Sequence, residues 1–209
     1  WGYHSAVVGN IAPTNGNLPK LTPYGANLDG TNFYDYGTNA AELELNLNPY
    51  TIMCWVYLRK TNDYAFGFGK LDDDTRDRWG VIVYGGDNYS SVQEYGRTAS
   101  YATNRSTIKK WYHLAGTISQ NGTNYFAKLY VDGVLCGTSA TNASTEIVTY
   151  DEGAMSRGVR AGVYGGSQSQ STYRYPSDGM IDRLCIVNGR ALPPETIYAI
   201  FEQTKSFYP

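Results

Sequence analysis

Hydrophobic and polar positions alternate with a period of two along much of the chain, which predicts an array of β-strands. In the clearest case, residues 51–59, both alternating sets are apolar: Ile52, Cys54, Val56 and Leu58 form one set, and Met53, Trp55 and Tyr57 form the other. A strand with two apolar faces is typical of a position that is covered on both sides. Similar segments predict strands at residues 6–8, 64–70, 79–85, 91–95, 111–119, 125–131, 134–139, 159–164 and 180–187.

Local turn and helix signals interrupt this array. Asp132-Gly133 lies between two apolar runs and favours a type I′ hairpin turn. The run Leu192-Pro193-Pro194-Glu195 predicts the start of a helix, because proline suits the first turn and an early acid complements the helix dipole. The following residues that share one helical face are Ile197, Ile200, Phe201 and Thr204. Many short strands followed by one helix indicate an all-β sandwich or barrel.

The organisation along the chain predicts one domain. Residues 1–26 contain Pro13, Pro19 and Pro23 and lack a sustained pattern, so we expect an irregular N-terminal segment there. Residues 27–209 show no internal repeat and form the predicted domain. Because the sequence starts at Trp1 rather than Met, we expect a mature chain or an excised domain of a larger protein.

Composition and charge limit the classes of function. The 17 basic and 19 acidic residues give a net charge of −2, which argues against binding to the phosphate backbone of nucleic acid. No apolar run is long enough for a membrane helix, so we expect no membrane insertion. The 20 tyrosines and the low charged fraction of 17% are typical of neutral, hydrogen-bonding surfaces such as sugar-binding faces. Three cysteines in apolar contexts, Cys54, Cys136 and Cys185, predict buried free thiols.

Five segments then follow one another along the chain: residues 27–34 (NLDGTNFY), 50–56 (YTIMCWV), 111–117 (WYHLAGT), 129–133 (LYVDG) and 178–192 (DGMIDRLCIVNGRAL). Together they resemble the laminin G-like domains of the concanavalin A-like lectin/glucanase superfamily. The resemblance implies an all-β jelly-roll sandwich of two antiparallel sheets with one short C-terminal helix. In such a sandwich we expect Trp55 and Trp111 to fill the space between the sheets, with His113 as a core residue beside them.

The same resemblance implies a Ca²⁺ ion, because laminin G-like domains often hold one. Its implied ligands are Asp29 in the first segment and Asp182 in the last. Carbonyl oxygens of the glycine-rich turns would complete the roughly six to eight ligands that calcium requires. From the residues alone, Asp29 could instead cap a turn through an Asx hydrogen bond. A second acidic segment, residues 72–77, fits a solvated hairpin tip better than a metal loop.

Catalysis would need residues that this sequence does not present in a suitable pattern. Glycoside cleavage uses two carboxylates that face one cleft, whereas the closest pair, Glu42 and Glu44, fits a solvated strand face. His4 lies in the irregular terminus and His113 in a predicted core strand, so neither suits a catalytic base. We therefore expect no enzymatic activity, with a divergent polysaccharide lyase or glycoside hydrolase as one alternative.

Tyrosines outside the family segments are candidates for ligand contact, since their rings can stack on a sugar and their hydroxyls can hydrogen-bond to it. The predicted ligand-binding residues are Tyr84, Tyr89, Tyr95, Tyr101, Tyr173, Arg174 and Tyr175. We expect a non-catalytic module that recognises a glycan or a glycosylated surface, within a larger extracellular or virion-surface assembly. In the alternative, these tyrosines simply rim the sandwich, and the chain is a structural part of a phage virion (tail fibre, tail tip or capsid decoration) that packs against neighbouring subunits.

Overall fold

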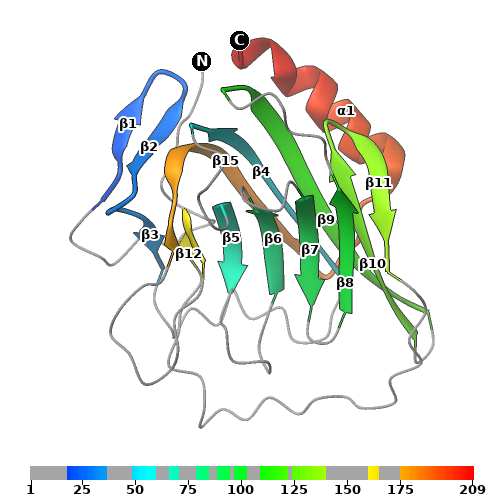
Figure 1. The fold of residues 1–209 in the computed structure, drawn as a ribbon. Coiled ribbons are helices and arrows are strands. Elements are labelled where there is room, and N and C mark those ends of the chain that lie inside the picture. The colour runs from blue at the N-terminus through cyan, green and yellow to red at the C-terminus, as the bar shows by residue number, and fades with distance from the viewer. Residues whose placement is uncertain are drawn as a thin grey trace, which may run out of the picture.

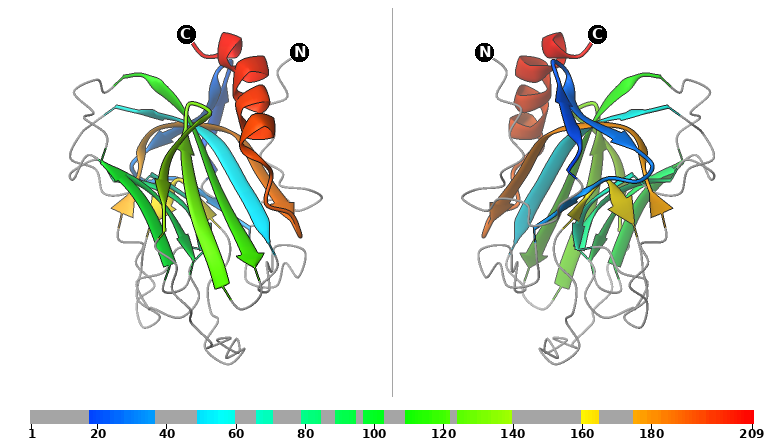
Figure 2. Two further views of the ribbon diagram at one scale, coloured as in Figure 1. Left: turned by 90° about the vertical axis from the view of Figure 1, so that its right-hand side faces the viewer. Right: turned by 90° about the vertical axis from the view of Figure 1, so that its left-hand side faces the viewer.

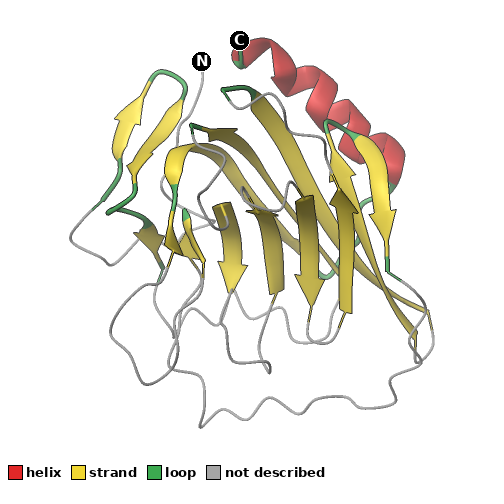
Figure 3. Ribbon diagram, in the orientation of Figure 1, coloured by secondary structure: helices red, strands yellow, loops and turns green. Residues whose placement is uncertain are grey.

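Two stacked β-sheets and one helix make up the protein. The computed structural model describes residues 18–36, 49–59, 66–70, 79–84, 89–94, 97–102, 109–121, 124–139, 160–164 and 175–209. A six-stranded sheet lies in front of a seven-stranded sheet, and the helix packs on the far side of the latter (Figures 1 and 2). Strands dominate the described part of the chain (Figure 3).

Both large sheets are antiparallel throughout. The seven-stranded sheet has the order β1 (Lys20–Thr22), β2 (Gly25–Asp29), β15 (Asp178–Asn188), β4 (Tyr50–Leu58), β9 (Trp111–Asn121), β10 (Asn124–Val131) and β11 (Val134–Thr138). The six-stranded sheet has the order β3 (Tyr34–Asp35), β12 (Arg160–Ala161), β5 (Phe66–Lys70), β6 (Trp79–Tyr84), β7 (Tyr89–Glu94) and β8 (Arg97–Ala102). A small third sheet pairs β13 (Val163–Tyr164) with β14 (Tyr175–Pro176). The predicted two-sheet antiparallel architecture with a C-terminal helix is confirmed.

Strand β4 is buried on both faces, as its alternation predicts. Ile52, Cys54 and Val56 are at most 1% exposed and belong to the core between the sheets, where Phe68 and Val81 meet them from the six-stranded sheet. Of the intervening side chains, Met53 and Trp55 are buried on the other face beneath the C-terminal residues, and Tyr57 is partly buried there.

Trp55 and Trp111 lie on this second face, so their predicted position between the sheets is wrong. The ring of Trp55 stacks on Tyr208 at a centroid distance of 4.2 Å, and its Nε1 donates to Thr204 Oγ1 at 3.1 Å. Trp111 contacts Tyr208 at 4.7 Å. The physical reason is the pleat of β4, because a residue between Cys54 and Val56 must point away from the inter-sheet core that they face.

The predicted hairpin and helix are both present. Asp132 and Gly133 have positive φ angles of 50° and 76°, as a type I′ turn requires. Helix α1 (Pro194–Thr204) begins with proline and buries Ile197 completely, and the short 3₁₀ helix η3 (Lys205–Phe207) follows it. A Cβ at Gly133 would lie only 3.0 Å from the Tyr198 ring, so glycine lets α1 pack closely on this turn. In the described residues, no helix has the length and apolar character needed to cross a membrane.

Two predictions at the N-terminus and the cysteines need adjustment. The predicted boundary between residues 26 and 27 falls inside β2, and β1 and β2 form an edge of the seven-stranded sheet, so residues 20–26 are part of the fold. The strand predicted at residues 6–8 lies outside the described residues. All three cysteines are free thiols, but only Cys54 is fully buried, whereas Cys136 and Cys185 are partly buried. Burial raises the pKa of the Cys54 thiol.

Replacing Tyr208 by alanine should lower the free energy of unfolding by about 3–5 kcal/mol, because removing this nearly buried ring leaves a cavity against Trp55. Tyr208→Phe keeps the ring but removes the hydroxyl that donates to Asp182 Oδ2 at 2.5 Å, and should cost about 1–3 kcal/mol. Urea denaturation followed by tryptophan fluorescence measures both effects. The adjacent Phe207 is 47% exposed, so Phe207→Ala is the control, with an expected loss of at most about 1 kcal/mol. Equal losses for the two alanine variants would contradict the packing role of Tyr208.

Candidate functional site

The outer face of the six-stranded sheet can be identified from the residues that point into the core, on the opposite face. Phe68 of β5, Val81 of β6 and Ala161 of β12 are at most 1% exposed and form one row across the sheet. All three belong to the core shared with the seven-stranded sheet. Because successive residues of a strand alternate between the faces, the adjacent row of positions belongs to the outer face.

That adjacent row contains two glycines side by side. Gly69 of β5 pairs with Gly80 of β6 on one side and with Arg160 of β12 on the other. The two glycines have φ angles of 141° and 155°, a backbone conformation that favours glycine. Gly67 lies two residues before Gly69, so it belongs to the same face. We call Gly67, Gly69 and Gly80 the glycine floor, because these outer-face positions carry no side chain.

An ion pair borders the glycine floor. Nε of Arg160 donates to Oδ2 of Asp35 at 3.2 Å, and the two side chains are only 12% and 13% exposed. Their strands pair directly, with Arg160 opposite Asp35. Gly69 and Gly80 are also buried, so the ion pair and the two glycines lie together in a place sheltered from solvent. This combination is typical of small-ligand sites, which place a few polar groups beside an otherwise apolar surface.

The register brings two of the predicted ligand-binding tyrosines to the same outer face. Tyr84 at the end of β6 pairs directly with Tyr89 at the start of β7. Tyr84 is three residues after the core-facing Val81, so the alternation of the strand places it on the outer face. Its directly paired partner, Tyr89, shares that face. Tyr101 pairs with Ser90, one position along the ladder, so the register places it in the core-facing row instead.

The other predicted ligand-binding residues are not brought to this sheet. Tyr175 lies in β14 and pairs with Tyr164 of β13 in the small two-stranded sheet. Tyr95, Tyr173 and Arg174 lie outside the described residues. Of the seven predicted residues, Tyr84 and Tyr89 are thus the two that the described register places together on the outer face.

The sequence analysis missed the glycine floor and the ion pair beside it. A signal for the floor exists in residues 66–69, where phenylalanine and glycine alternate, so that one face carries rings and the other carries no side chain. No local signal could reveal the pair of Arg160 and Asp35, because 125 residues separate them in sequence.

The two predicted calcium ligands are not brought together. Asp29 on β2 pairs with Asp178 on β15, and Asp182 follows four residues later on β15. At about 3.3 Å per residue, their strand positions are about 13 Å apart. Calcium lies about 2.3–2.6 Å from each ligand oxygen, so the oxygens of two ligands of one ion are at most about 5 Å apart. The prediction that one calcium ion is held by both Asp29 and Asp182 therefore does not fit this geometry and is corrected here.

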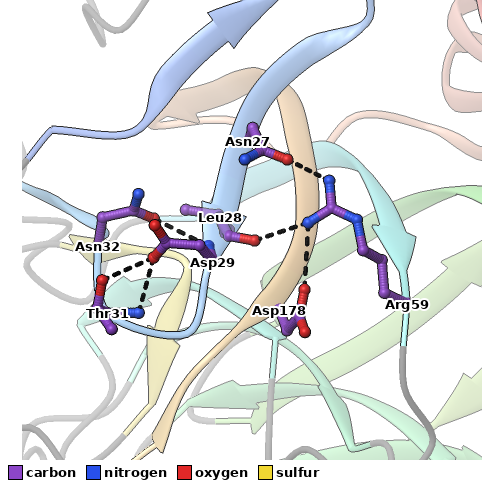
Figure 4. Close-up of polar contacts among 7 residues, drawn as sticks. All are labelled: Asn27, Leu28, Asp29, Thr31, Asn32, Arg59 and Asp178. Atoms are coloured by element: carbon purple, nitrogen blue, oxygen red, sulfur yellow. Dashed lines mark hydrogen bonds and ion pairs between the residues drawn. The ribbon is translucent and has the colours of Figure 1, made fainter.

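Each of these carboxylates has protein partners. Oδ1 of Asp29 accepts hydrogen bonds from the Thr31 hydroxyl at 2.7 Å and the Thr31 backbone N–H at 2.9 Å (Figure 4), and these bonds lower the pKa of Asp29. This is the Asx turn that the sequence offered as the alternative role of Asp29. Asp182 is buried and accepts from the Tyr208 hydroxyl, which itself accepts from Nε of Arg183 at 3.2 Å.

The described candidates for catalysis do not form a reactive cluster. His113 is 2% exposed and contacts the rings of Trp55 and Phe201 at centroid distances of 5.3 and 6.1 Å, which confirms its predicted core position, although beneath α1 rather than between the sheets. Burial lowers the pKa of His113 to about 4, so the ring is neutral at pH 7. Among the described residues, no three His, Cys, Asp or Glu side chains gather closely enough to hold a metal ion. Four other candidates lie outside those residues: His4, Glu42, Glu44 and the acidic segment 72–77.

The two-sheet architecture with its sequence segments defines the class of protein. A protein-family model described as the concanavalin A-like lectin/glucanases superfamily matches residues 29–198. The chain therefore belongs to this superfamily, as the five segments indicate. A comparison with curated protein sequences found no match.

Solved structures with the same fold include several sugar-binding domains. The CBM40 domain of Ruminococcus gnavus IT-sialidase, bound to α2,3-sialyllactose, has a TM-score of 0.57 and 17% identity, over 84% of this chain and 95% of that one. Domain 4 of AbnA, an extracellular arabinanase from Geobacillus stearothermophilus, in complex with arabinotriose, has a TM-score of 0.54 and 20% identity, over 92% and 81%. The binding domain of botulinum neurotoxin DC in complex with SialylT has a TM-score of 0.57 and 14% identity, over 91% and 45%. At these identities the likeness concerns the fold alone.

The buried His113 predicts a pH-dependent term in stability. Its pKa is about 4 in the folded chain and about 6.5 when unfolded, so the unfolded chain binds the proton more tightly. The stabilisation is complete above pH 6.5 and is lost progressively as the pH falls to 4, by about 3 kcal/mol in total at about 1.4 kcal/mol per pKa unit.

Urea unfolding at several pH values tests this term by comparing the wild type with His113→Phe. The variant should lose stability less steeply between pH 6.5 and pH 4, whereas the control His4→Gln should follow the wild type. Parallel curves for the wild type and His113→Phe would show that His113 does not carry this pH dependence.

Proposed function

We propose that this chain is a non-catalytic module that binds an oligosaccharide on the outer face of the six-stranded sheet. The observation that carries the proposal is the glycine floor, which lies between the Arg160–Asp35 ion pair and the outer-face positions of Tyr84 and Tyr89. These elements occupy neighbouring strands of one sheet, so a ligand of a few sugar units would span them.

The chemistry of sugars suits such a surface. A pyranose or furanose ring has an apolar face of C–H groups and a rim of hydroxyls, so it stacks on aromatic rings and flat surfaces while its rim seeks neutral and charged hydrogen-bonding groups. Glycine carries no side chain that would keep a sugar ring away from the backbone, and tyrosine side chains contribute contact area at little entropic cost. A net charge of −2 on 209 residues keeps the chain near neutral, which suits recognition through such groups rather than through long-range attraction.

The comparisons support this proposal at the level of the fold. Structures similar to this chain were determined with sialyllactose, with arabinotriose and with SialylT. The ring of His113 is neutral at pH 7 and enclosed by the core, so it is not placed to act as a catalytic base.

The setting that we propose is a larger extracellular assembly. Two of the similar structures are single domains of bigger proteins, an extracellular arabinanase and a neurotoxin. A binding module of this kind would hold its partner domains close to a glycan or a glycosylated surface.

Replacing Tyr84 or Tyr89 by alanine should weaken glycan binding by about 5–30-fold, which corresponds to about 1–2 kcal/mol for the loss of a stacked ring. A glycan array that includes α2,3-sialyllactose and arabinotriose identifies the ligand, and isothermal titration calorimetry of the strongest hit measures the loss. Tyr198 of α1 is 49% exposed on the opposite side of the molecule, so Tyr198→Ala is the matched control and should bind like the wild type.

Three results would count against the proposal. Equal binding by Tyr84→Ala, Tyr89→Ala and the control would place the site elsewhere. A folded wild type that binds no glycan on the array would remove the glycan-binding function. If that protein also elutes as a trimer or larger assembly, the structural virion role becomes the better explanation.

A further inference from the structure

Three charged residues form a row across one corner of the seven-stranded sheet. Asp29 of β2 pairs with Asp178 of β15, and Arg59, which directly follows β4, donates its backbone N–H to the Asp178 carbonyl at 3.3 Å. Directly opposed residues on adjacent strands lie close enough that two like charges destabilise the sheet. The Thr31 hydrogen bonds lower the pKa of Asp29 and so keep its carboxylate charged. This corner therefore requires a nearby positive charge.

The guanidinium group of Arg59 supplies that charge from the centre of a set of oxygen atoms (Figure 4). Its Nη1 donates to the Leu28 carbonyl oxygen at 2.9 Å and to Oδ1 of Asp178 at 3.1 Å. Its Nη2 donates to Oδ1 of Asn27. One carboxylate, one backbone carbonyl and one side-chain amide thus converge on a single cationic group.

The same three kinds of oxygen are those that calcium selects in proteins. Arginine can replace a metal ion in such a set because its charge is permanent and its planar fork donates several hydrogen bonds at fixed angles. The Asp178 side chain is 16% exposed and that of Arg59 is 34% exposed, so the pair is only partly screened by solvent. The set joins β2, β15 and the end of β4, which are neighbours in the sheet.

We propose that Arg59 is the resident cation of this corner and occupies an oxygen set of the kind that otherwise holds a divalent metal ion. The corner made by Asn27, Leu28, Asp178 and Arg59 then needs no divalent metal for its stability. A direct consequence is that removing the guanidinium should uncover an oxygen set that a divalent cation can occupy. This inference concerns the packing of the sheet corner and does not depend on glycan binding.

Thermal unfolding of the wild type and Arg59→Ser, each in EDTA and in about 5 mM CaCl₂, tests the proposal. In EDTA, Arg59→Ser should melt about 3–8 °C below the wild type, because it loses charge-assisted hydrogen bonds and leaves Asp178 without that partner. Calcium should then raise the melting temperature of Arg59→Ser by about 2–5 °C more than it raises that of the wild type, as expected for a millimolar-range site. Asp178→Asn in the Arg59→Ser background should abolish this extra rise.

Two further variants keep the test decisive. Arg160→Ser removes the Arg160–Asp35 pair in the other sheet and should lower the melting temperature without any extra rise in calcium. Arg59→Lys keeps the positive charge but lacks the planar guanidinium group, so it should fold even if Arg59→Ser does not. Its melting temperature should lie between those of the wild type and Arg59→Ser, and its calcium response should match that of the wild type.

Three outcomes would overturn the inference. The first is an Arg59→Ser variant as stable as the wild type. The second is a calcium response in Arg59→Ser that does not exceed that of the wild type, or that Arg160→Ser reproduces. The third is a calcium response of the wild type that Asp178→Asn alone abolishes, because calcium would then occupy the corner together with Arg59.

Discussion

The burial of β4 on both of its faces is the constraint on which the rest of the structure depends. One face meets Phe68 and Val81 of the six-stranded sheet, and the other meets α1 and the residues that follow it. A strand with two apolar faces cannot lie at a surface without exposing one of them, so it needs a second layer on each side. The six-stranded sheet covers one face of β4, and the C-terminal helix with the residues after it covers the other. The loss of either layer would expose large aromatic or aliphatic surfaces.

Local patterns predict the parts of the fold that short-range geometry decides. The alternation in residues 51–59, the Asp132-Gly133 turn and the proline-led helix need only their own segments, and all three are present. The face of Trp55 was beyond such reasoning, because alternation separates two faces without saying which one the second sheet covers. The strand limits at the N-terminus differ for a related reason: β2 pairs with β15, about 150 residues later in the chain, and β1 pairs in turn with β2.

The candidate site shows the same division between local and distant information. Tyrosine-rich composition pointed to Tyr84 and Tyr89, and only the strand register separates them from Tyr101. The ion pair beside the glycine floor joins residues 125 positions apart, and the oxygen set around Arg59 joins it to Asp178, 119 positions away, and to Leu28, 31 positions away. Neither has a periodicity or spacing that a single sequence could display. Asp29 illustrates the converse, since its Asx turn with Thr31 is local and was foreseeable.

The docking of Tyr208 helps to cover one outer side of the sandwich and so distinguishes it from the other. This residue packs with Trp55 and Trp111 on the face of the seven-stranded sheet that lies opposite the core between the sheets. Figure 2 shows the helix on that outer side, away from the six-stranded sheet. A scaffold that contacts this helix-covered face would leave the opposite, six-stranded face turned outward. Several copies on one scaffold would then face the same surface together, and their combined avidity could exceed the affinity of one site by about 10²–10⁴ without a single new contact.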